Sequence, residues 1–286
     1  MRVRRSMLYV PGISEKMIRK SVELKTDAII FDLEDAVALD QKEKAREVLK
    51  NLLNELSFGE KEIVVRVNGL QSGLTEEDLK WTLSEKIDAV LLPKVLSEED
   101  VKKFDEMVEK ISKEKGIKKE LKIHLMIETP SSVLRIREIC KTSEKLSALL
   151  LGSADLSKEM RCKNKKEILQ PLIAHIIAGG RAGNLDVIDA PFFNIKDLDG
   201  LEKDCLLAKE MGFDGKQVIH PSQIEIVNKI FSPSEEEILW AEKVISQYEP
   251  AMRKGIGVIS VDGEMIERLH YEQALRIKKL SERREK

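Results

Sequence analysis

The sequence predicts an α/β fold: a closed (β/α)8 barrel that continues into a helical extension at its carboxyl end. Eight short apolar runs alternate with longer stretches of helical period. Few of these runs alternate polar and apolar residues, as expected of parallel strands that are covered on both faces. The length of 286 residues is close to the roughly 250 typical of such a barrel. Eight strands favour the barrel over a doubly wound sheet, which usually has about five or six.

Short runs rich in isoleucine, leucine and valine mark the predicted strands. They cover residues 6–10, 28–33, 63–67, 89–92, 123–127, 148–151, 185–188 and 217–219. Amphipathic segments between them predict helices, including residues 15–24, 42–53, 98–113 and 200–211. Ser14 and Ser97 precede acidic first turns, where anionic side chains suit a helix N-terminus.

The chain continues after the eighth strand beyond what a barrel needs. Residues 234–252 and 266–281 have the pattern of helices, and a segment punctuated by glycines, residues 255–263, separates them. We therefore divide the chain into a barrel over residues 1–232 and an extension over residues 233–286. We expect the extension to pack on the barrel or, more specifically, on a neighbouring subunit.

The composition excludes several classes of function. The formal net charge is −2, so the chain lacks the basic footprint of a protein that binds nucleic acid. No apolar run is long enough to span a bilayer, and the arginine-rich start leads directly into a strand, so we expect neither a membrane anchor nor a signal peptide. Cys140, Cys162 and Cys205 are scattered without metal-ligand spacing, which favours a reducing, cytoplasmic compartment.

Polar residues follow the predicted strands directly, all round the ring. Barrel enzymes build their active sites from the carboxyl ends of the strands and the loops that follow. The strand-end residues are Asp32, Glu34 and Asp35 after the second strand, Arg66 in the third, Lys94 after the fourth, Glu128 after the fifth, Asp155 after the sixth, Asp189 after the seventh and His220 after the eighth. The repetition predicts a polar rim at this end of the barrel.

Glu128 and Asp155 are the candidate metal ligands within this rim. They follow successive strands and could reach a common point, and Mg²⁺ is typically held by one or two carboxylates, with water and substrate oxygens completing the octahedron. The alternative is that both are salt-bridge partners at the top of the barrel. Zn²⁺ is less favoured, because the four histidines and three cysteines show no tight ligand spacing.

The other strand-end residues have both functional and structural interpretations. Asp32, Glu34 and Asp35 could orient Arg66, Lys94 or a water on the metal, and Arg66 could equally form an ion pair with one of these three acids. Lys94 could form a Schiff base, as in some aldolases, although an ion-paired lysine is the favoured interpretation.

The remaining strand-end candidates have structural interpretations. We interpret His220 as a hydrogen-bonded loop anchor, Asp189 as either a rim residue or a helix cap, and His124, in the middle of a strand, as a satisfied core residue.

The motifs resemble those of the citrate lyase β-subunit family, within the HpcH/HpaI aldolase/citrate lyase superfamily of phosphoenolpyruvate/pyruvate-type barrels. They occur in the family's order over nearly the whole chain. The matching segments are Arg5-Ser6-Met7-Leu8, Val10-Pro11-Gly12, Phe31-Asp32-Leu33-Glu34-Asp35-Ala36-Val37, Lys44-Ala45-Arg46, Arg66-Val67-Asn68, Leu92-Pro93-Lys94, Ile127-Glu128-Thr129-Pro130, Gly152-Ser153-Ala154-Asp155-Leu156, Gly212-Phe213-Asp214-Gly215-Lys216, Ile219-His220-Pro221-Ser222-Gln223-Ile224, Phe231-Ser232-Pro233-Ser234 and Gly263-Glu264-Met265-Ile266-Glu267.

The resemblance implies a set of site residues. Glu128 and Asp155 match the family's Mg²⁺ carboxylates, and Arg66 matches an arginine near the substrate carbonyl and carboxylate. Asp32, Glu34 and Asp35 are expected beside the substrate. Arg5 and the Pro11-Gly12 turn match the region where such enzymes approach the thioester carrier.

The resemblance also implies a reaction and a proton-transfer residue. Members cleave or form carbon–carbon bonds in citryl, malyl or citramalyl thioesters. The carboxyl-terminal segment can reach a neighbouring subunit and supply a proton-transfer carboxylate, which many members hold as Asp and this chain holds as Glu267, longer by one methylene. Either the site has shifted to suit another substrate, or Glu267 is not the acid or base.

The resemblance leaves the exact reaction and the partners open. The alternatives are a malate-synthase-like or malyl-CoA thioesterase activity, a class II-type aldolase acting on free aldehydes, and a barrel that has lost its chemistry and persists as an assembly subunit. We expect a homo-oligomer, a trimer or a hexamer. An acyl carrier protein and a transferase subunit are the expected partners if the chain is a true citrate lyase subunit.

Overall fold

The computed structural model describes residues 2–282, which divide into two compact units. The first unit spans Arg4–Asn228, and the second comprises the described residues on either side of it. No helix among residues 2–282 is both long and apolar enough to cross a membrane.

The first unit is built on eight parallel strands that pair in chain order and close on themselves. Their bounds are β1 Ser6–Pro11, β2 Ala28–Asp32, β3 Glu62–Arg66, β4 Ala89–Leu92, β5 Lys122–Ile127, β6 Leu146–Leu151, β7 Asp186–Asp189 and β8 Gly215–Val218. Leu8 is in register with Ile29 of β2 on one side and with Val218 of β8 on the other, which closes the ring. The predicted barrel is confirmed.

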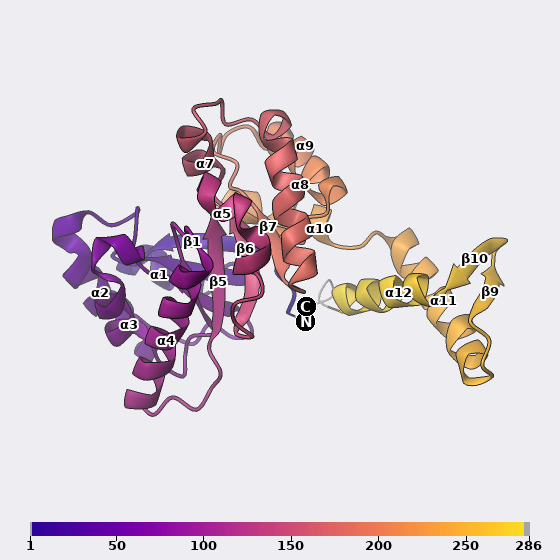
Figure 1. The fold of residues 1–286 in the computed structure, drawn as a ribbon, viewed down its shortest axis with the longest axis horizontal. Helices are drawn as coiled ribbons and strands as arrows, with labels where there is room; N and C mark the ends of the chain where they lie inside the picture. The colour runs from indigo at the N-terminus through magenta and orange to yellow at the C-terminus, as the bar shows by residue number, and fades with distance from the viewer. Residues whose placement is uncertain (1, 283–286) are drawn as a thin grey trace. The chain divides into compact units, whose positions relative to one another are not determined.

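Helices follow the strands and lie outside them (Figure 1). Their bounds are α1 Glu15–Ser21, α2 Lys42–Glu55, α3 Thr75–Thr82, α4 Glu98–Glu114, α5 Pro130–Leu134, α6 Ile136–Ile139, α7 Ser153–Glu159, α8 Lys166–Ala182, α9 Leu198–Met211 and α10 Ile224–Phe231, with short 3-10 turns at Leu39–Gln41, Leu70–Ser72 and Pro221–Gln223. The four predicted helices correspond to α1, α2, α4 and α9. Ser14 and Ser97 stand at N-cap positions as expected, although neither side chain forms a capping hydrogen bond.

Buried side chains fill the barrel interior, and a charged layer lies at the amino ends of the strands. A cluster that includes Met7, Ile30 and Leu150 forms the apolar filling. At the amino end, Arg4 pairs with Glu62 of β3 (2.6 Å) and Asp186 of β7 (2.5 Å). Charges placed at this end of a barrel serve stability rather than catalysis.

His124, which was expected to be a satisfied core residue, is fully buried but lacks hydrogen bonds within the described chain. Its Nε2 lies 3.6 Å from Glu62 Oε1, which is too long for a hydrogen bond, and neither ring nitrogen has another partner. Burial lowers the pKa of His124, so the ring stays neutral.

The second unit packs two helices, α11 Glu235–Arg253 and α12 Arg268–Ser281, around a small apolar core. The predicted helices are confirmed, but the segment between them is a hairpin, β9 Val258–Val261 and β10 Glu264–Glu267, rather than a plain connection. Asp262 (φ 52°) and Gly263 (φ 86°) form its turn. Asp-Gly between two short apolar runs is a strong hairpin signal, because both central residues of a type I′ turn need positive φ.

Candidate active site

The barrel brings the predicted strand-end residues together on one arc of its carboxyl rim. Asp32 ends β2, Arg66 ends β3, Lys94 follows β4 and Glu128 follows β5. The register aligns Asp32 with Arg66, and Arg66 with Leu91 of β4. Parallel neighbours with matched ends therefore deliver charged side chains to adjacent points of the same rim.

Arg66 lies at the centre of this arc and is held on two sides. Its Nε and Nη2 donate to the two carboxylate oxygens of Asp32 at 2.7 and 2.6 Å, a bidentate pair. Its third nitrogen, Nη1, lies 3.1 Å from Glu34 Oε2 and 3.8 Å from Asp35 Oδ2. Although burial alone would raise the pKa of Asp32, the hydrogen bonds and charge of Arg66 lower it, so the pair stays ionised.

The ring of Tyr9, in β1, packs against the guanidinium of Arg66. The guanidinium carbon of Arg66 lies 5.0 Å from the centre of the Tyr9 ring, which is within the range of a cation–π contact. The Tyr9 hydroxyl donates to Gln217 Oε1 (2.9 Å), and Gln217 Nε2 donates to the carbonyl oxygens of Leu151 and Asp189. Neither Tyr9 nor Gln217 was predicted from the sequence. The polar run Lys216-Gln217 inside a buried strand was the available signal.

Lys94 joins the acidic side chains of two strand ends. Its backbone N–H donates to Glu128 Oε1 at 2.7 Å, and its Nζ donates to Glu34 Oε1 at 2.6 Å. Burial lowers the pKa of Lys94, but the Glu34 carboxylate outweighs burial and raises it, so the side chain remains an ammonium. A lysine that forms Schiff bases needs the opposite shift, and the ion-paired interpretation of Lys94 is confirmed.

Glu128 is a buried carboxylate against the backbone that follows β6. A Cβ on Gly152 would lie 2.4 Å from Glu128 Cβ and 2.6 Å from its Oε2, so only glycine fits beside this side chain. Burial raises the pKa of Glu128 to about 8, and the charges of Glu34 and Asp155 add to this rise. Asp155 lies in the first turn of α7 and is half-buried. Its charge contributes to the raised pKa of Glu128.

The donor set fits a hard divalent cation. The arc holds five carboxylates and two cations. The carboxylates belong to Asp32, Glu34, Asp35, Glu128 and Asp155, and the cations are Arg66 and Lys94. A divalent ion beside Glu128 would stabilise its charged form against the burial and the neighbouring acids that raise its pKa. Among residues 2–282 no group of three or more His, Cys, Asp or Glu side chains is placed to hold a metal. Mg²⁺ is typically held by one or two carboxylates, with water and substrate oxygens as its other ligands.

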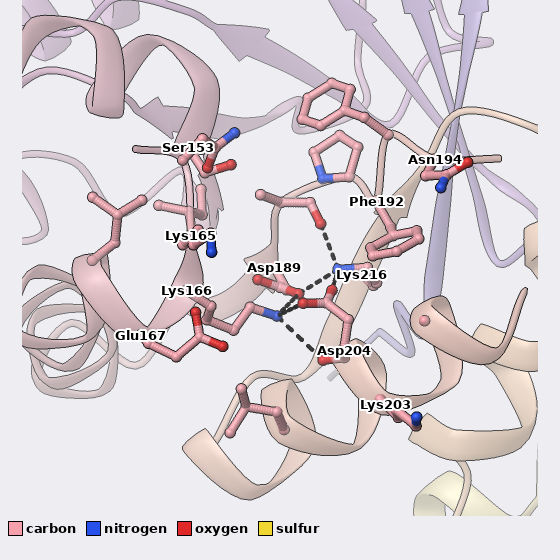
Figure 2. A pocket seen from close by; sticks show the side chains of 18 of the residues that line it. Ser153, Lys165, Lys166, Glu167, Asp189, Phe192, Asn194, Lys203, Asp204 and Lys216 are labelled. Carbon is pink, nitrogen blue, oxygen red and sulfur yellow. Dashed lines mark hydrogen bonds and ion pairs between the residues drawn. The ribbon is translucent and has the colours of Figure 1, made fainter. Parts of the chain in front are cut away.

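A second charged cluster lies at the ends of β7 and β8, lining a cavity of about 550 Å³ (Figure 2). Lys216 of β8 is 1% exposed and donates to Asp189 (2.5 Å) and Asp204 (2.5 Å), while Lys166 lies 2.8 Å from each of the same two acids. Despite burial, the two lysines lower the pKa of Asp204. Asp189 is thus an ion-pair partner rather than a helix cap. Neither lysine was predicted from the sequence, because this buried pairing joins residues that are distant in the chain.

Arg5 lies away from the arc, and Glu267 belongs to the second unit. Arg5 precedes β1 and forms a bidentate pair with Asp27, which precedes β2 (2.9 Å for both nitrogens). Both residues lie at the amino ends of parallel strands, opposite the carboxyl rim, and the expected place of Arg5 beside a thioester carrier stays a prediction. Glu267 ends β10 in the second unit, where its N–H donates to His270 Nδ1 (3.1 Å).

The loop after β8 has the role predicted for it. His220 Nδ1 accepts a hydrogen bond from the backbone N–H of Ser222 at 3.2 Å and lies 2.8 Å from the Ser222 hydroxyl. These bonds form the short turn Pro221–Gln223. His220 is a loop anchor, as expected.

A closed parallel barrel with an arginine and five carboxylates gathered at its carboxyl rim has the arrangement of a barrel enzyme. Comparison with known proteins gives the family. Residues 5–221 match the model of the HpcH/HpaI aldolase/citrate lyase family. The chain belongs to this family, and its likeness to citrate lyase β subunits makes it an enzyme of the lyase class.

Individual relatives cover nearly the whole chain. The (3S)-malyl-CoA thioesterase of Cereibacter sphaeroides is 38% identical over 268 residues, which is 93% of this chain and 90% of the relative. The citrate lyase subunit beta of Leuconostoc mesenteroides is 34% identical over 284 residues, covering 98% and 94%. The structure of the protein CitE of Mycobacterium tuberculosis, solved with magnesium, acetoacetate and coenzyme A, shares the fold with a TM-score of 0.75 at 23% identity, over 99% of this chain and all of that one.

Proposed function

We propose that this enzyme is a magnesium-dependent lyase that cleaves a 3-hydroxy acyl thioester, of the citryl, malyl or citramalyl type, to an acetyl thioester and an α-keto acid. The observation that carries the proposal is the arc of Glu128, Asp155 and Arg66, which stand at the carboxyl ends of β5, β6 and β3. The names of the relatives support thioester chemistry, and magnesium in the structure of one of them supports the metal.

Glu128 and Asp155 are the residues that would hold the ion. Magnesium supplies Lewis acidity there, which stabilises negative charge on substrate oxygens. Gly152 and the Lys94 amide place the Glu128 carboxylate at the rim. Because Glu128 is 2% exposed, its charge is poorly solvated and it gains most from a cation.

Arg66 would bind the substrate and stabilise the negative charge that develops on it as the carbon–carbon bond breaks. Asp32 uses two of its nitrogens, and Nη1 is the one left facing the acidic side of the arc. A guanidinium held in this way is preorganised, and preorganised charge of this kind is often worth about 3–4 kcal/mol in a transition state. Glu34 and Asp35 would orient Nη1 of Arg66 beside the substrate, and both also lie close to Lys94 Nζ.

The balanced reaction needs one proton transfer on each side of the broken bond. The bond between the hydroxyl-bearing carbon and the thioester α-carbon breaks, the hydroxyl gives its proton to water and becomes the keto oxygen, and the electron pair stays on the thioester as an enolate. The α-carbon then takes up a proton. We assign this protonation to Glu267, supplied by a neighbouring subunit in a trimer or hexamer, and the reverse abstraction to the same carboxylate in condensation.

The carrier and the compartment are part of the same proposal. The thioester is borne by coenzyme A or by an acyl carrier protein, and in the second case a transferase subunit would complete the complex. A cytoplasmic location is supported by Cys140, Cys162 and Cys205, which are free thiols in the structure.

The test is a mass-spectrometric assay with Mg²⁺ against citryl-, malyl- and citramalyl-CoA. An α-keto acid and acetyl-CoA formed in equal amounts are the expected products. Glu128→Gln and Asp155→Asn should each abolish metal-dependent turnover. Full metal-dependent activity in both variants would contradict the proposal.

Hydrolysis is a second candidate, because the thioesterase of Cereibacter sphaeroides is 38% identical. The same arc could serve both reactions. Malyl-CoA converted to free malate and CoA, without glyoxylate, would identify the hydrolase, and cleavage of a free hydroxy acid without any thioester would identify an aldolase.

A further inference from the structure

Lys94 has a backbone conformation that its residue type disfavours. Its φ is 54°, in the left-handed region, where a lysine pays a steric cost between its Cβ and the carbonyl oxygen. The other non-glycine residues with positive φ among those described are Arg161, Asn184 and Asp262, and Asn and Asp tolerate this region better. A strained residue at the rim of a site needs contacts that hold it there.

Three contacts restrain the chain at this point. The Lys94 N–H donates to Glu128 Oε1 at 2.7 Å, and Lys94 Nζ donates to Glu34 Oε1 at 2.6 Å. The next residue, Val95, accepts a hydrogen bond from Thr129 Oγ1 at 2.9 Å. At this positive φ the amide reaches Glu128, the next carbonyl oxygen accepts from Thr129, and the side chain reaches Glu34, all at the same time.

We propose that Lys94 is a positioning residue, whose ion pair with Glu34 holds its backbone at positive φ so that its amide presents the Glu128 carboxylate to the cation. This inference rests on the magnesium site proposed above. In this role the backbone amide of Lys94 acts on Glu128, and the side chain only holds the backbone in place. Lys94 then needs neither to act as a nucleophile nor to touch the substrate.

Two substitutions separate the backbone role from the loss of charge. Both Lys94→Ala and Lys94→Gly remove the ion pair. Alanine lowers its steric energy by leaving the left-handed region, whereas glycine can stay there without a steric penalty. We expect Lys94→Ala to weaken Mn²⁺ binding about tenfold and Lys94→Gly to remain within about threefold of the unaltered protein. Lys94→Arg, which keeps a cation opposite Glu34 and cannot form a Schiff base, should also stay within about threefold.

Mn²⁺ affinity of the full-length protein, followed by electron paramagnetic resonance, is the readout, and it needs no turnover. Thermal unfolding without metal provides the second readout, in which Lys94→Gly should be at least as stable as Lys94→Ala. Equal Mn²⁺ affinity in both variants, whether weakened or intact, would overturn the inference. Glu128→Gln separates the two proposals. If this variant keeps its Mn²⁺ affinity, the proposed metal site is wrong. If it loses Mn²⁺ affinity while Lys94→Ala keeps it, only the role of Lys94 is contradicted.

Discussion

Gly152 lies against Glu128 so closely that a Cβ at position 152 would be 2.4 Å from the Cβ of Glu128. The contact joins the end of β6 to the residue after β5, the two strands that carry the proposed metal carboxylates. The glycine is therefore part of the geometry of the site, because it sets how deeply Glu128 can sit beside the backbone that leads to Asp155.

Gly152→Ala should displace Glu128 and weaken the metal site. Overpacking of this kind typically costs about 1–3 kcal/mol of stability, and a displaced ligand should lower Mg²⁺ affinity about tenfold or more. Calorimetric titration and thermal unfolding measure both effects. Gly257→Ala, in the second unit, is the control, since nothing lies within 4 Å of a methyl group added there. Equal Mg²⁺ affinity in the two variants would show that Gly152 does not place Glu128.

The raised pKa of Glu128 predicts that metal binding releases a proton. With a pKa of about 8 in the metal-free protein, Glu128 is largely protonated at pH 7, so Mg²⁺ affinity should rise up to tenfold per pH unit until about pH 8 and then level off. Titrations at pH 7 in buffers of different ionisation enthalpy count the protons released. Glu128→Gln should release none, and a flat affinity from pH 6 to 9 in the unaltered protein would contradict the assignment.

The same shift sets the sign of a stability effect. The folded-state pKa lies above the ordinary value of 4.5, so between pH 4.5 and 8 the folded protein binds more protons than the unfolded chain, and this contribution to stability falls as the pH rises. Added Mg²⁺ should reduce that slope, because the bound cation replaces the proton. Thermal unfolding across this range, with and without Mg²⁺, compares the two slopes.

Arg66→Lys should separate charge from geometry. Lysine keeps the positive charge but cannot form the bidentate pair with Asp32. We expect kcat to fall about a hundredfold, with Mg²⁺ affinity changed by less than about threefold, because preorganised charge acts in the transition state. Arg19→Lys, in an exposed ion pair with Glu15 and Glu55, is the control and should keep full activity. A matching loss of metal affinity in Arg66→Lys would instead place Arg66 among the residues that build the metal site.

The fold could be read from the sequence because its signals are local. Apolar runs without alternation marked all eight strands, and the placement of charged residues after them marked the rim. Asp32, Arg66 and Glu128 could be assigned to one face because the ends of parallel strands share it. The sequence left open which acid pairs with Arg66, because the choice between Asp32, Glu34 and Asp35 depends on side-chain geometry.

Other features depend on contacts between distant residues and could not be predicted. Lys216 and Lys166 are far apart in the sequence, and only the closed barrel shows that they share Asp189 and Asp204. Arg5 was assigned to the substrate by resemblance alone, and its burial against Asp27 at the amino end follows from its position ahead of β1. The positive φ of Lys94 has no signal in residue type, because lysine does not favour it.

Glu267 can be tested through the exchange of subunits. If its carboxylate serves the active site of a neighbouring subunit, Glu128→Gln and Glu267→Gln should each be inactive alone but restore activity when co-expressed with different tags and purified as mixed oligomers. A random one-to-one mixture in a cyclic oligomer contains roughly a quarter of sites with both carboxylates intact, so about a quarter of the normal turnover is expected. If Glu267 acted on its own barrel, every subunit of the mixture would lack one of the two groups and no activity would return. Glu267→Asp adds a check on length: retained activity would show that the site accepts either carboxylate, whereas a loss of roughly a hundredfold would show that it is fitted to the longer side chain.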